Sequence, residues 1–156
     1  MIVNEQDYKL VATALMAQLP QCEANEGIVF MGHGTPRDNN KAHGYTYLKM
    51  QSIFDELGAP IVVGTVEDED QPNFDAVLEQ IEKRGYQKVH MYPLMVVAGD
   101  HANNDMAGDD EDSWKSMFVA SEAFESVDAQ IAGLGRIADV QAVYVAHTAD
   151  AIASME

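Results

Sequence analysis

Three side chains that could bind a metal ion each follow a short apolar run of the chain. They are His33, Glu67 and His101. Two imidazoles and a carboxylate suit a divalent first-row metal, and a site with so few protein ligands keeps positions open for a substrate or water. The residue types and their placement therefore predict a metal site with open coordination positions.

These residues come together only if the apolar runs are strands of one parallel sheet. The runs are short and dense in apolar residues, as in strands that are buried on both faces. The carboxyl ends of parallel strands share one edge of a sheet, where open α/β folds bind their ligands. We therefore expect His33, Glu67 and His101 to converge at that edge. The predicted strands are 28–31, 61–66, 87–97 and a weaker one at 127–131.

Helical patterns separate the predicted strands. Strands that alternate with helices imply βαβ units and right-handed crossovers. The expected fold class is α/β, a three-layer sandwich in which helices flank a parallel, mainly four-stranded sheet. We expect a single domain over residues 1–156, with the first helix as an N-terminal arm. The predicted helices are 4–19, 38–57, 72–84, a segment around Trp114, and 137–154.

The chain is strongly acidic, with a net charge of −17 from 26 acidic and 9 basic residues. This charge repels phosphate backbones and argues against a nucleic-acid partner. It could serve solubility or a saline habitat, or attract metal cations. No apolar run approaches the ~20 residues of a membrane span. The N-terminus lacks the pattern of a signal peptide, and the single cysteine fits a reducing compartment, so we expect a cytoplasmic protein.

Each candidate ligand also has a purely structural interpretation. His33 and His101 could be hydrogen-bonded loop residues, and Glu67 could belong to a solvated acidic loop. We interpret His90 and His147 as structural residues of a strand and a helix. His43 is interpreted in the same way, with a secondary role at the rim of the site as the alternative.

Two further groups of residues are expected to stabilise the fold. Acidic residues near the helix that contains Trp114 are expected to cap its free N–H groups. They are Asp105, Asp109, Asp110, Glu111 and Asp112. Several methionines are expected to fill the core rather than bind a soft metal. They are Met50, Met91, Met95, Met106 and Met117.

Four segments together resemble a known family. They read GHGT at 32–35, VGTVE at 63–67, PLMVVAGDHANNDMA at 93–107 and DDEDSWK at 109–115. They are similar to the anaerobic sirohydrochlorin cobaltochelatases of cobalamin synthesis, which belong to the class II chelatases. The resemblance extends from about Asn4 to the C-terminus.

The resemblance implies a chelatase-like, flavodoxin-like topology and a lyase reaction. The reaction is the insertion of cobalt(II), or in some relatives iron(II) or nickel(II), into sirohydrochlorin without ATP. By resemblance, His33 is the principal metal ligand and proton acceptor, His101 is the second ligand, and Glu67 completes the site and offsets its charge. The residues expected to contact the tetrapyrrole are Gly34, Thr35, Arg37, Ala98 and Gly99.

The chain departs from the family pattern in two respects. It matches the C-terminal half of proteins that have two similar α/β halves around a cleft. It is therefore either a half-size enzyme that works as a homodimer or a fragment. In addition, sirohydrochlorin is a polycarboxylate, so an acidic protein needs a local positive rim. The candidate cations are Arg37, Lys41, Lys115 and Arg136.

Two other functional classes compete with the enzyme. A binding module could carry a tetrapyrrole or metal without turnover, which the half-size chain and acidic surface favour. A metal-dependent hydrolase could use the same three ligands, but no nucleophile is evident near them. The complete set of His33, Glu67 and His101 favours the chelatase.

Overall fold

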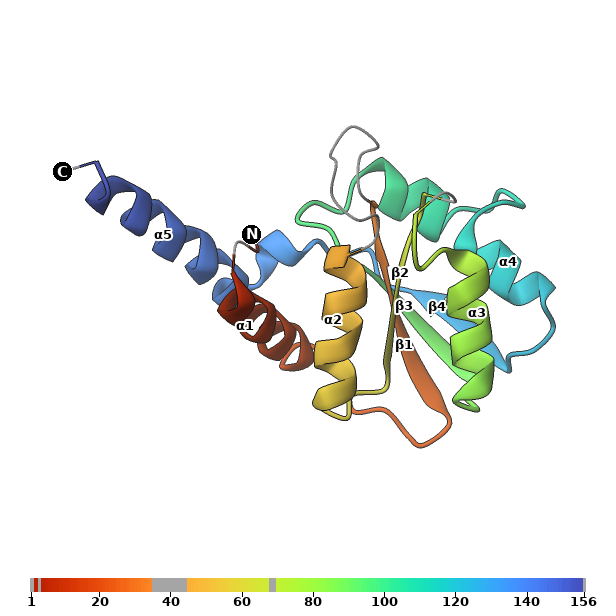
Figure 1. The fold of residues 1–156 in the computed structure, drawn as a ribbon. Coiled ribbons are helices and arrows are strands. Elements are labelled where there is room, and N and C mark those ends of the chain that lie inside the picture. The colour runs from red at the N-terminus through yellow and green to blue at the C-terminus, as the bar shows by residue number, and fades with distance from the viewer. Residues whose placement is uncertain (1, 3, 35–44, 68–69, 156) are drawn as a thin grey trace.

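A parallel sheet of four strands forms the centre of the computed structural model, which describes residues 2, 4–34, 45–67 and 70–155 (Figure 1). The strand order is β2-β1-β3-β4, and all three pairings are parallel. This confirms the predicted α/β class with a four-stranded parallel sheet. The strands are β1 (Glu26–Gly32), β2 (Ile61–Thr65), β3 (Lys88–Pro93) and β4 (Ser126–Ala129).

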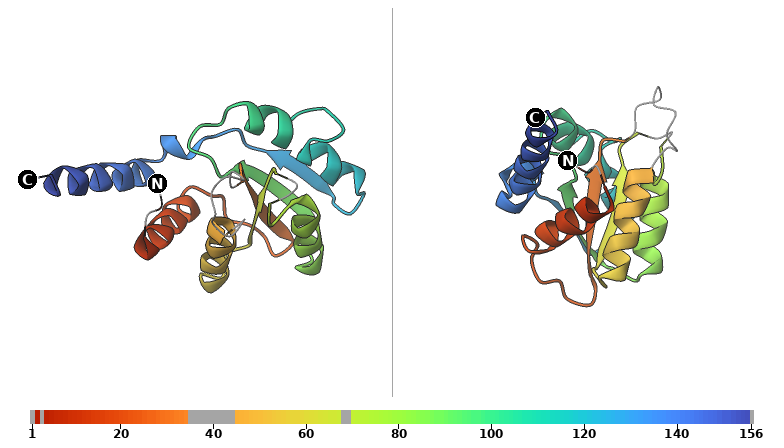
Figure 2. Two further views of the ribbon diagram at one scale, coloured as in Figure 1. Left: turned by 45° about the horizontal axis from the view of Figure 1, so that its top comes forward. Right: turned by 60° about the vertical axis from the view of Figure 1, so that its left-hand side comes forward.

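Helices cover both faces of the sheet and make the fold three-layered (Figure 2). Helices α1 and α2 pack on one face, whereas α3 and α4 pack on the other. The α-helices are α1 (Glu5–Met16), α2 (Tyr45–Glu56), α3 (Phe74–Lys83), α4 (Trp114–Ala120) and α5 (Ala138–Ala153). Two short helical turns complete the described elements, a π-helix η1 (Ala102–Met106) and a 3₁₀-helix η2 (Leu134–Arg136).

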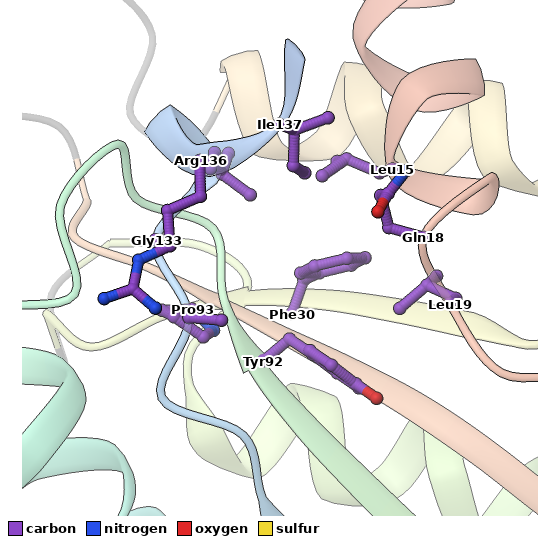
Figure 3. Close-up of a pocket in the computed structure, with 11 residues that line it drawn as sticks. Leu15, Gln18, Leu19, Phe30, Tyr92, Pro93, Gly133, Arg136 and Ile137 are labelled. Atoms are coloured by element: carbon purple, nitrogen blue, oxygen red, sulfur yellow. The ribbon is translucent and has the colours of Figure 1, made fainter. Parts of the chain in front are cut away.

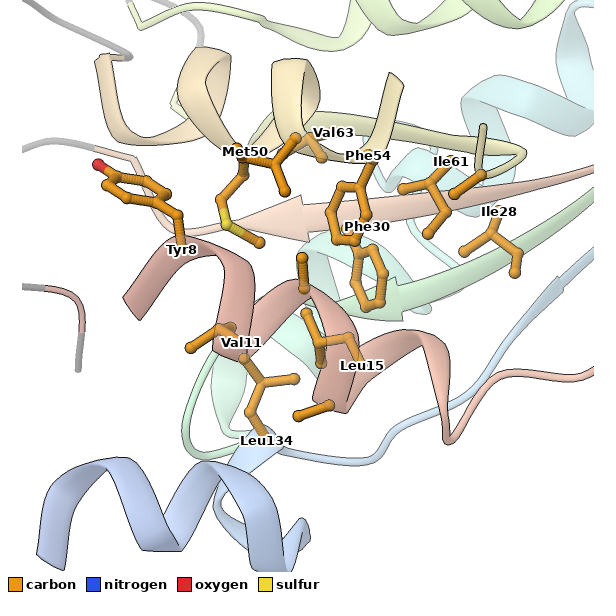
Figure 4. Close-up of a cluster of buried hydrophobic side chains, with 14 of the residues drawn as sticks. Tyr8, Val11, Leu15, Ile28, Phe30, Met50, Phe54, Ile61, Val63 and Leu134 are labelled. Carbon is orange, nitrogen blue, oxygen red and sulfur yellow. The ribbon is translucent and has the colours of Figure 1, made fainter. Parts of the chain in front are cut away.

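The central strand β1 divides its side chains between two cores, because successive side chains of a strand point to opposite faces. Ile28 and Phe30 belong to the core beneath α1 and α2, where Phe30 stacks on Phe54 with ring centroids 5.9 Å apart (Figure 4). Val29 and Met31 belong to the core beneath α3 and α4. A strand that is buried on both faces explains why the sequence shows a continuous apolar run here.

The core beneath α3 and α4 contains a cluster of aromatic side chains, which pack closely against a glycine of β2. Phe74, Trp114 and Phe118 contact one another edge to face. Gly64 of β2 packs directly against Trp114, because a Cβ atom added at this position would lie 2.7 Å from Cη2 of the tryptophan. Any larger residue would push the tryptophan out of place, so glycine at 64 is a packing requirement. The methionines at 50, 91 and 106 are fully buried, which confirms their role in the core.

The prediction that β3 continues to Val97 is wrong, because the strand ends at Pro93. Its neighbour β1 ends in the same place, and the last bond between them runs from the Leu94 N–H to the Met31 carbonyl. Beyond that bond, none of the described strands continues alongside β3, and the chain bends. Val96 and Val97 are consequently 41% and 74% exposed rather than buried.

Other predicted boundaries shift by a few residues. Helix α1 begins after the predicted cap Asn4, whose side chain accepts from the Gln6 and Asp7 N–H groups, but it ends at Met16 rather than residue 19. Strand β4 ends at Ala129 rather than residue 131. The first part of the predicted helix 38–57 lies outside the described residues, and its described part is α2. Within the described residues, no helix is both long and apolar enough to cross a membrane.

Candidate functional site

The two candidate histidine ligands meet at the carboxyl edge of the sheet. His33 directly follows β1, and His101 lies in the helical turn that leads into η1. Their rings lie edge to face, with centroids 4.5 Å apart and planes at 89°. His33 is exposed and His101 is half-buried, so both imidazoles are accessible to a ligand. The structure thus brings His33 and His101 together at this edge, as expected, although His101 follows the end of β3 by eight residues rather than directly.

A carboxylate one helical turn further on orients His101. Nδ1 of His101 is hydrogen-bonded to Oδ2 of Asp105, which lies within the π-helix η1. Single π-helical turns are frequent at functional sites. With Nδ1 engaged, Nε2 is the nitrogen that remains for a metal, and a carboxylate partner makes an imidazole a better ligand. The sequence analysis did not identify this role of Asp105.

The predicted capping role of the acidic residues is wrong, because Ser113 caps α4. The Ser113 hydroxyl accepts from the Ser116 N–H at 3.2 Å and donates to the Gly108 carbonyl at 2.8 Å. The first turn of α4 contains no acidic residue. A short hydroxyl reaches its own helix end more directly than carboxylates in the preceding loop. Asp109 instead lies near a lysine of α4, with its Oδ1 atom 3.6 Å from Nζ of Lys115.

Glu67 lies beside the histidine pair but does not complete a three-ligand group. It follows β2 and is exposed. Its side chain packs against Gly34, where an added Cβ atom would lie 2.8 Å from Cγ of Glu67, and the φ angle of Gly34 is +108°. Across the described ranges, no three His, Cys, Asp or Glu side chains are gathered closely enough to hold a metal ion. The described site is thus a histidine pair with a carboxylate nearby.

Tyr47 of α2 holds the backbone on both sides of His33. The Gly34 N–H donates to Oη of Tyr47 at 3.0 Å, and the hydroxyl in turn faces the Gly34 carbonyl at 3.4 Å. The tyrosine ring also covers Gly32, where an added Cβ atom would lie 2.8 Å from Cζ. Burial raises the pKa of the Tyr47 hydroxyl; the bond from Gly34 opposes this rise, and the charge of Asp70 adds to it.

Sequence reasoning did not identify Tyr47 as a residue of the site. Tyr47, Met50 and Phe54 occupy one face of α2 and pack against the same core. Their spacing is that of an ordinary buried helix face, so the pattern predicts a core residue. Nothing in the spacing shows that the hydroxyl reaches the backbone of Gly34.

The predicted tetrapyrrole contacts are described in part. Gly34 adjoins His33, while Ala98 and Gly99 lie in the segment that leads to His101. The Gly99 carbonyl accepts from the Asn103 side chain at 2.6 Å, and an added Cβ atom on Gly99 would meet nothing within 4 Å. The space next to Gly99 is therefore open. Thr35, Arg37, Lys41 and His43 lie outside the described residues.

The two other histidines among the described residues, His90 and His147, have structural partners, as predicted. Nδ1 of His90 lies 2.7 Å from Oδ2 of Asp128 and joins β3 to β4. Nε2 of His147 lies 3.1 Å from the buried carboxylate of Asp7 and joins α5 to α1. Neither belongs to the histidine pair at the sheet edge.

The fold and the site define a class of protein: a parallel three-layer α/β domain with paired imidazoles at the carboxyl edge of its sheet. The sequence matches the family model described as cobalt chelatase (CbiK) over residues 2–153. The chain therefore belongs to the CbiK cobalt chelatase family.

Two curated relatives agree with this assignment. The chain is 35% identical over 153 residues to the sirohydrochlorin cobaltochelatase of Salmonella typhimurium, covering 97% of this chain and 54% of the relative. It is 32% identical over 122 residues to the sirohydrochlorin cobaltochelatase CbiKC of Nitratidesulfovibrio vulgaris, covering 78% of this chain and 41% of the relative. The chain spans about half the length of the curated relatives it matches.

Proposed function

We propose that this protein inserts cobalt(II) into sirohydrochlorin without ATP. The observation that carries the proposal is the accessible pair of His33 and His101, 4.5 Å apart at the carboxyl edge of the sheet. Cobalt(II) is the proposed metal because the family model is that of a cobalt chelatase. Imidazole also suits iron(II) and nickel(II), which are the alternative substrates.

In the proposed reaction His101 binds the incoming metal through Nε2, since Asp105 occupies its Nδ1. His33 is the principal metal ligand, and the nearby carboxylate of Glu67 offsets the metal charge. Two pyrrole N–H protons must leave as the metal enters the macrocycle. His33 accepts one after it releases the metal, and solvent accepts the other. An imidazole side chain can serve first as a metal ligand and then as a proton acceptor, because histidines in general gain or lose a proton near neutral pH.

The working unit is proposed to be a homodimer. Helix α5 extends away from the sheet (Figure 2) and exposes large apolar side chains, among them Tyr144, Val145 and Ile152. A second copy of the chain would cover this apolar face. We expect Val145→Glu to shift the protein towards monomer in light scattering. Val119→Glu on α4 is the matched control, because Val119 is 59% exposed and Val145 is 68% exposed.

The compartment and the extent of the domain are also proposals. The described elements share one sheet and its two cores, which supports one chelatase-type domain over residues 1–156 with the helix at 4–19 as its N-terminal arm. The single cysteine, Cys22, supports a reducing cytoplasm as the compartment.

Anaerobic turnover tests the activity. Sirohydrochlorin and cobalt(II) are mixed with the protein, and the absorbance change is compared with the spontaneous rate. We expect acceleration that is lost in His33→Ala and retained in His90→Gln, a histidine variant away from the site. Acceleration that persists in His33→Ala would contradict the assigned role.

The second candidate function is that of a carrier that binds a tetrapyrrole or metal without turnover. The acidic surface favours it, because a net charge of −17 repels a polycarboxylate that must be bound closely for metal insertion. Tetrapyrrole binding without acceleration of metal insertion would support the carrier and reject the chelatase.

A further inference from the structure

A cavity of about 230 Å³ lies at the carboxyl ends of β1 and β3 and has no part in the proposed chemistry of the histidines (Figure 3). It opens between α1, the ends of β1 and β3, and the segment that includes η2. Its lining is mainly apolar, with Leu15, Leu19, Phe30, Tyr92, Pro93 and Ile137. Such a cavity suits the hydrocarbon part of a ligand.

Arg136 brings a positive charge to this apolar cavity. Its side chain lines the cavity and extends towards Gly133 and Pro93 (Figure 3). Four other described cations, Lys49, Arg84, Lys88 and Lys115, have carboxylate partners within 4 Å, whereas Lys9 and Lys83 are exposed on helices away from this cavity. Arg136 forms no ion pair with any carboxylate in the part of the chain that the structure describes. In a chain with a net charge of −17, its guanidinium group is thus available to an anionic ligand.

The cavity and the histidine site lie at the same edge of the sheet and are linked by the backbone. The Leu134 N–H donates to the Met95 carbonyl at 2.8 Å, and the Gly135 N–H donates to the Val96 carbonyl at 2.9 Å. These bonds hold the segment after β3, which continues into the helical turn of His101. On the other side, Pro93 of the cavity pairs with Met31, two residues before His33. A ligand at the histidines could therefore extend a side chain into the cavity.

We propose that this cavity, with Arg136 at its opening, binds one carboxylate-bearing side chain of the tetrapyrrole substrate. The methylene groups of that side chain pack against the apolar wall, and its carboxylate forms a charge-assisted, bidentate hydrogen bond with Arg136. Arg136 would thus offset part of the repulsion between an acidic protein and a polycarboxylate. The inference rests on the proposed function, because it takes the tetrapyrrole as the ligand of the adjacent histidines.

Direct titration with sirohydrochlorin, in the absence of metal, tests the proposal. Arg136→Gln should raise the Kd by about tenfold, as expected for the loss of a hydrogen bond between charged groups. Lys83→Gln is the matched control, since Lys83 is exposed in the last turn of α3, does not line the cavity, and undergoes the same charge change. Ala132→Phe should also raise the Kd, because it fills the cavity without changing a charge.

Cobalt(II) titration in the absence of tetrapyrrole provides the second measurement. The Kd for cobalt(II) should be unchanged in Arg136→Gln and Ala132→Phe, because the cavity is separate from the histidine rings. Equal sirohydrochlorin affinity in Arg136→Gln and Lys83→Gln would overturn the proposal while leaving the chelatase function intact. Parallel losses of cobalt(II) and sirohydrochlorin binding would show that Arg136 acts on the fold and would also overturn it. A wild-type protein that does not bind sirohydrochlorin would reject the proposed function together with this inference.

Discussion

The rings of His33 and His101 lie edge to face with centroids 4.5 Å apart, although they follow different strands of the sheet. Their proximity results from the direct pairing of β1 with β3, which aligns Met31 with Pro93. Because β1 is buried on two faces and contributes to both cores, a shift in the register of this pair would disrupt both cores. The same packing that stabilises the sheet therefore keeps the two imidazoles together.

Loss of either imidazole should weaken cobalt(II) binding in the absence of tetrapyrrole. We expect His33→Ala and His101→Ala each to raise the Kd by roughly 100-fold or more, since even partners of metal ligands contribute up to about that factor. Isothermal titration calorimetry measures the effect. His90→Gln, which alters a histidine paired with Asp128, should bind as the wild type does. Unchanged affinity in both alanine variants would reject the histidine pair as the metal site.

Asp105 is expected to act through His101. Asp105→Asn replaces a carboxylate with a weaker acceptor, and we expect the Kd for cobalt(II) to rise by about 10- to 100-fold. The unfolding temperature should change little, because the Asp105 side chain is partly exposed. Asp112→Asn, an exposed acid in the same stretch, serves as the control. Equal affinities for the two variants would show that the Asp105 contact does not influence the site.

Removal of the Tyr47 hydroxyl should loosen the backbone around His33. Tyr47→Phe keeps the ring over Gly32 but loses the hydrogen bond from Gly34, which should lower the free energy of unfolding by about 1 kcal/mol. Metal insertion should slow while the KM for sirohydrochlorin stays nearly constant, because the substrate contacts remain. Tyr45→Phe on the same helix is the control, since Tyr45 is exposed. A rate unchanged in Tyr47→Phe would exclude this positioning role.

The raised pKa of Tyr47 predicts a loss of stability at alkaline pH. Its folded-state pKa lies above that of the unfolded chain, so folding favours the protonated phenol. This contribution is complete below the unfolded pKa of about 10 and is lost as the pH rises through the folded value. The free energy of unfolding of the wild type should therefore fall relative to that of Tyr47→Phe above pH ~10. A constant difference between the two proteins in alkaline urea titrations would contradict this prediction.

Gly64 should tolerate no side chain. Gly64→Ala places a methyl group against Trp114 and should lower the free energy of unfolding by about 1–3 kcal/mol, as overpacking of a core does. Urea denaturation followed by tryptophan fluorescence measures this change. Gly99→Ala is the control, because its added Cβ atom meets open space. Similar stabilities for the two variants would contradict the close packing at Gly64.

Sequence periodicity was sufficient to predict the α/β fold and the convergence of the two histidines. Both follow from local patterns, since buried strands are apolar and their carboxyl ends share an edge. The end of β3 at Pro93 could not be predicted in the same way. Val96 and Val97 continue the apolar pattern, but a strand ends where its partner ends, and that depends on the length of β1.

Contacts between side chains and distant backbone were the hardest to predict. The bond between Tyr47 and Gly34 depends on how α2 packs on the sheet, which spacing along the chain does not specify. The bond between His101 and Asp105 is local, at a separation of four residues. A helical turn in the Asn- and Asp-rich segment places the two side chains next to each other, whereas a loop at the same position does not predict their hydrogen bond. Glu67 follows the predicted strand, yet adjacency to Gly34 alone does not make it a ligand.

The strand order β2-β1-β3-β4 determines when the histidine pair can form while the chain is being synthesised. The first strand of the chain lies inside the sheet, and one of its neighbours, β3, begins only at Lys88. A nascent chain that has left the ribosome up to α3 can pair β1 with β2 but has no second imidazole beside His33. The histidine pair therefore forms late, once β3 has docked and His101 has followed it. Unfinished chains would accordingly compete poorly for scarce metal ions in the cell.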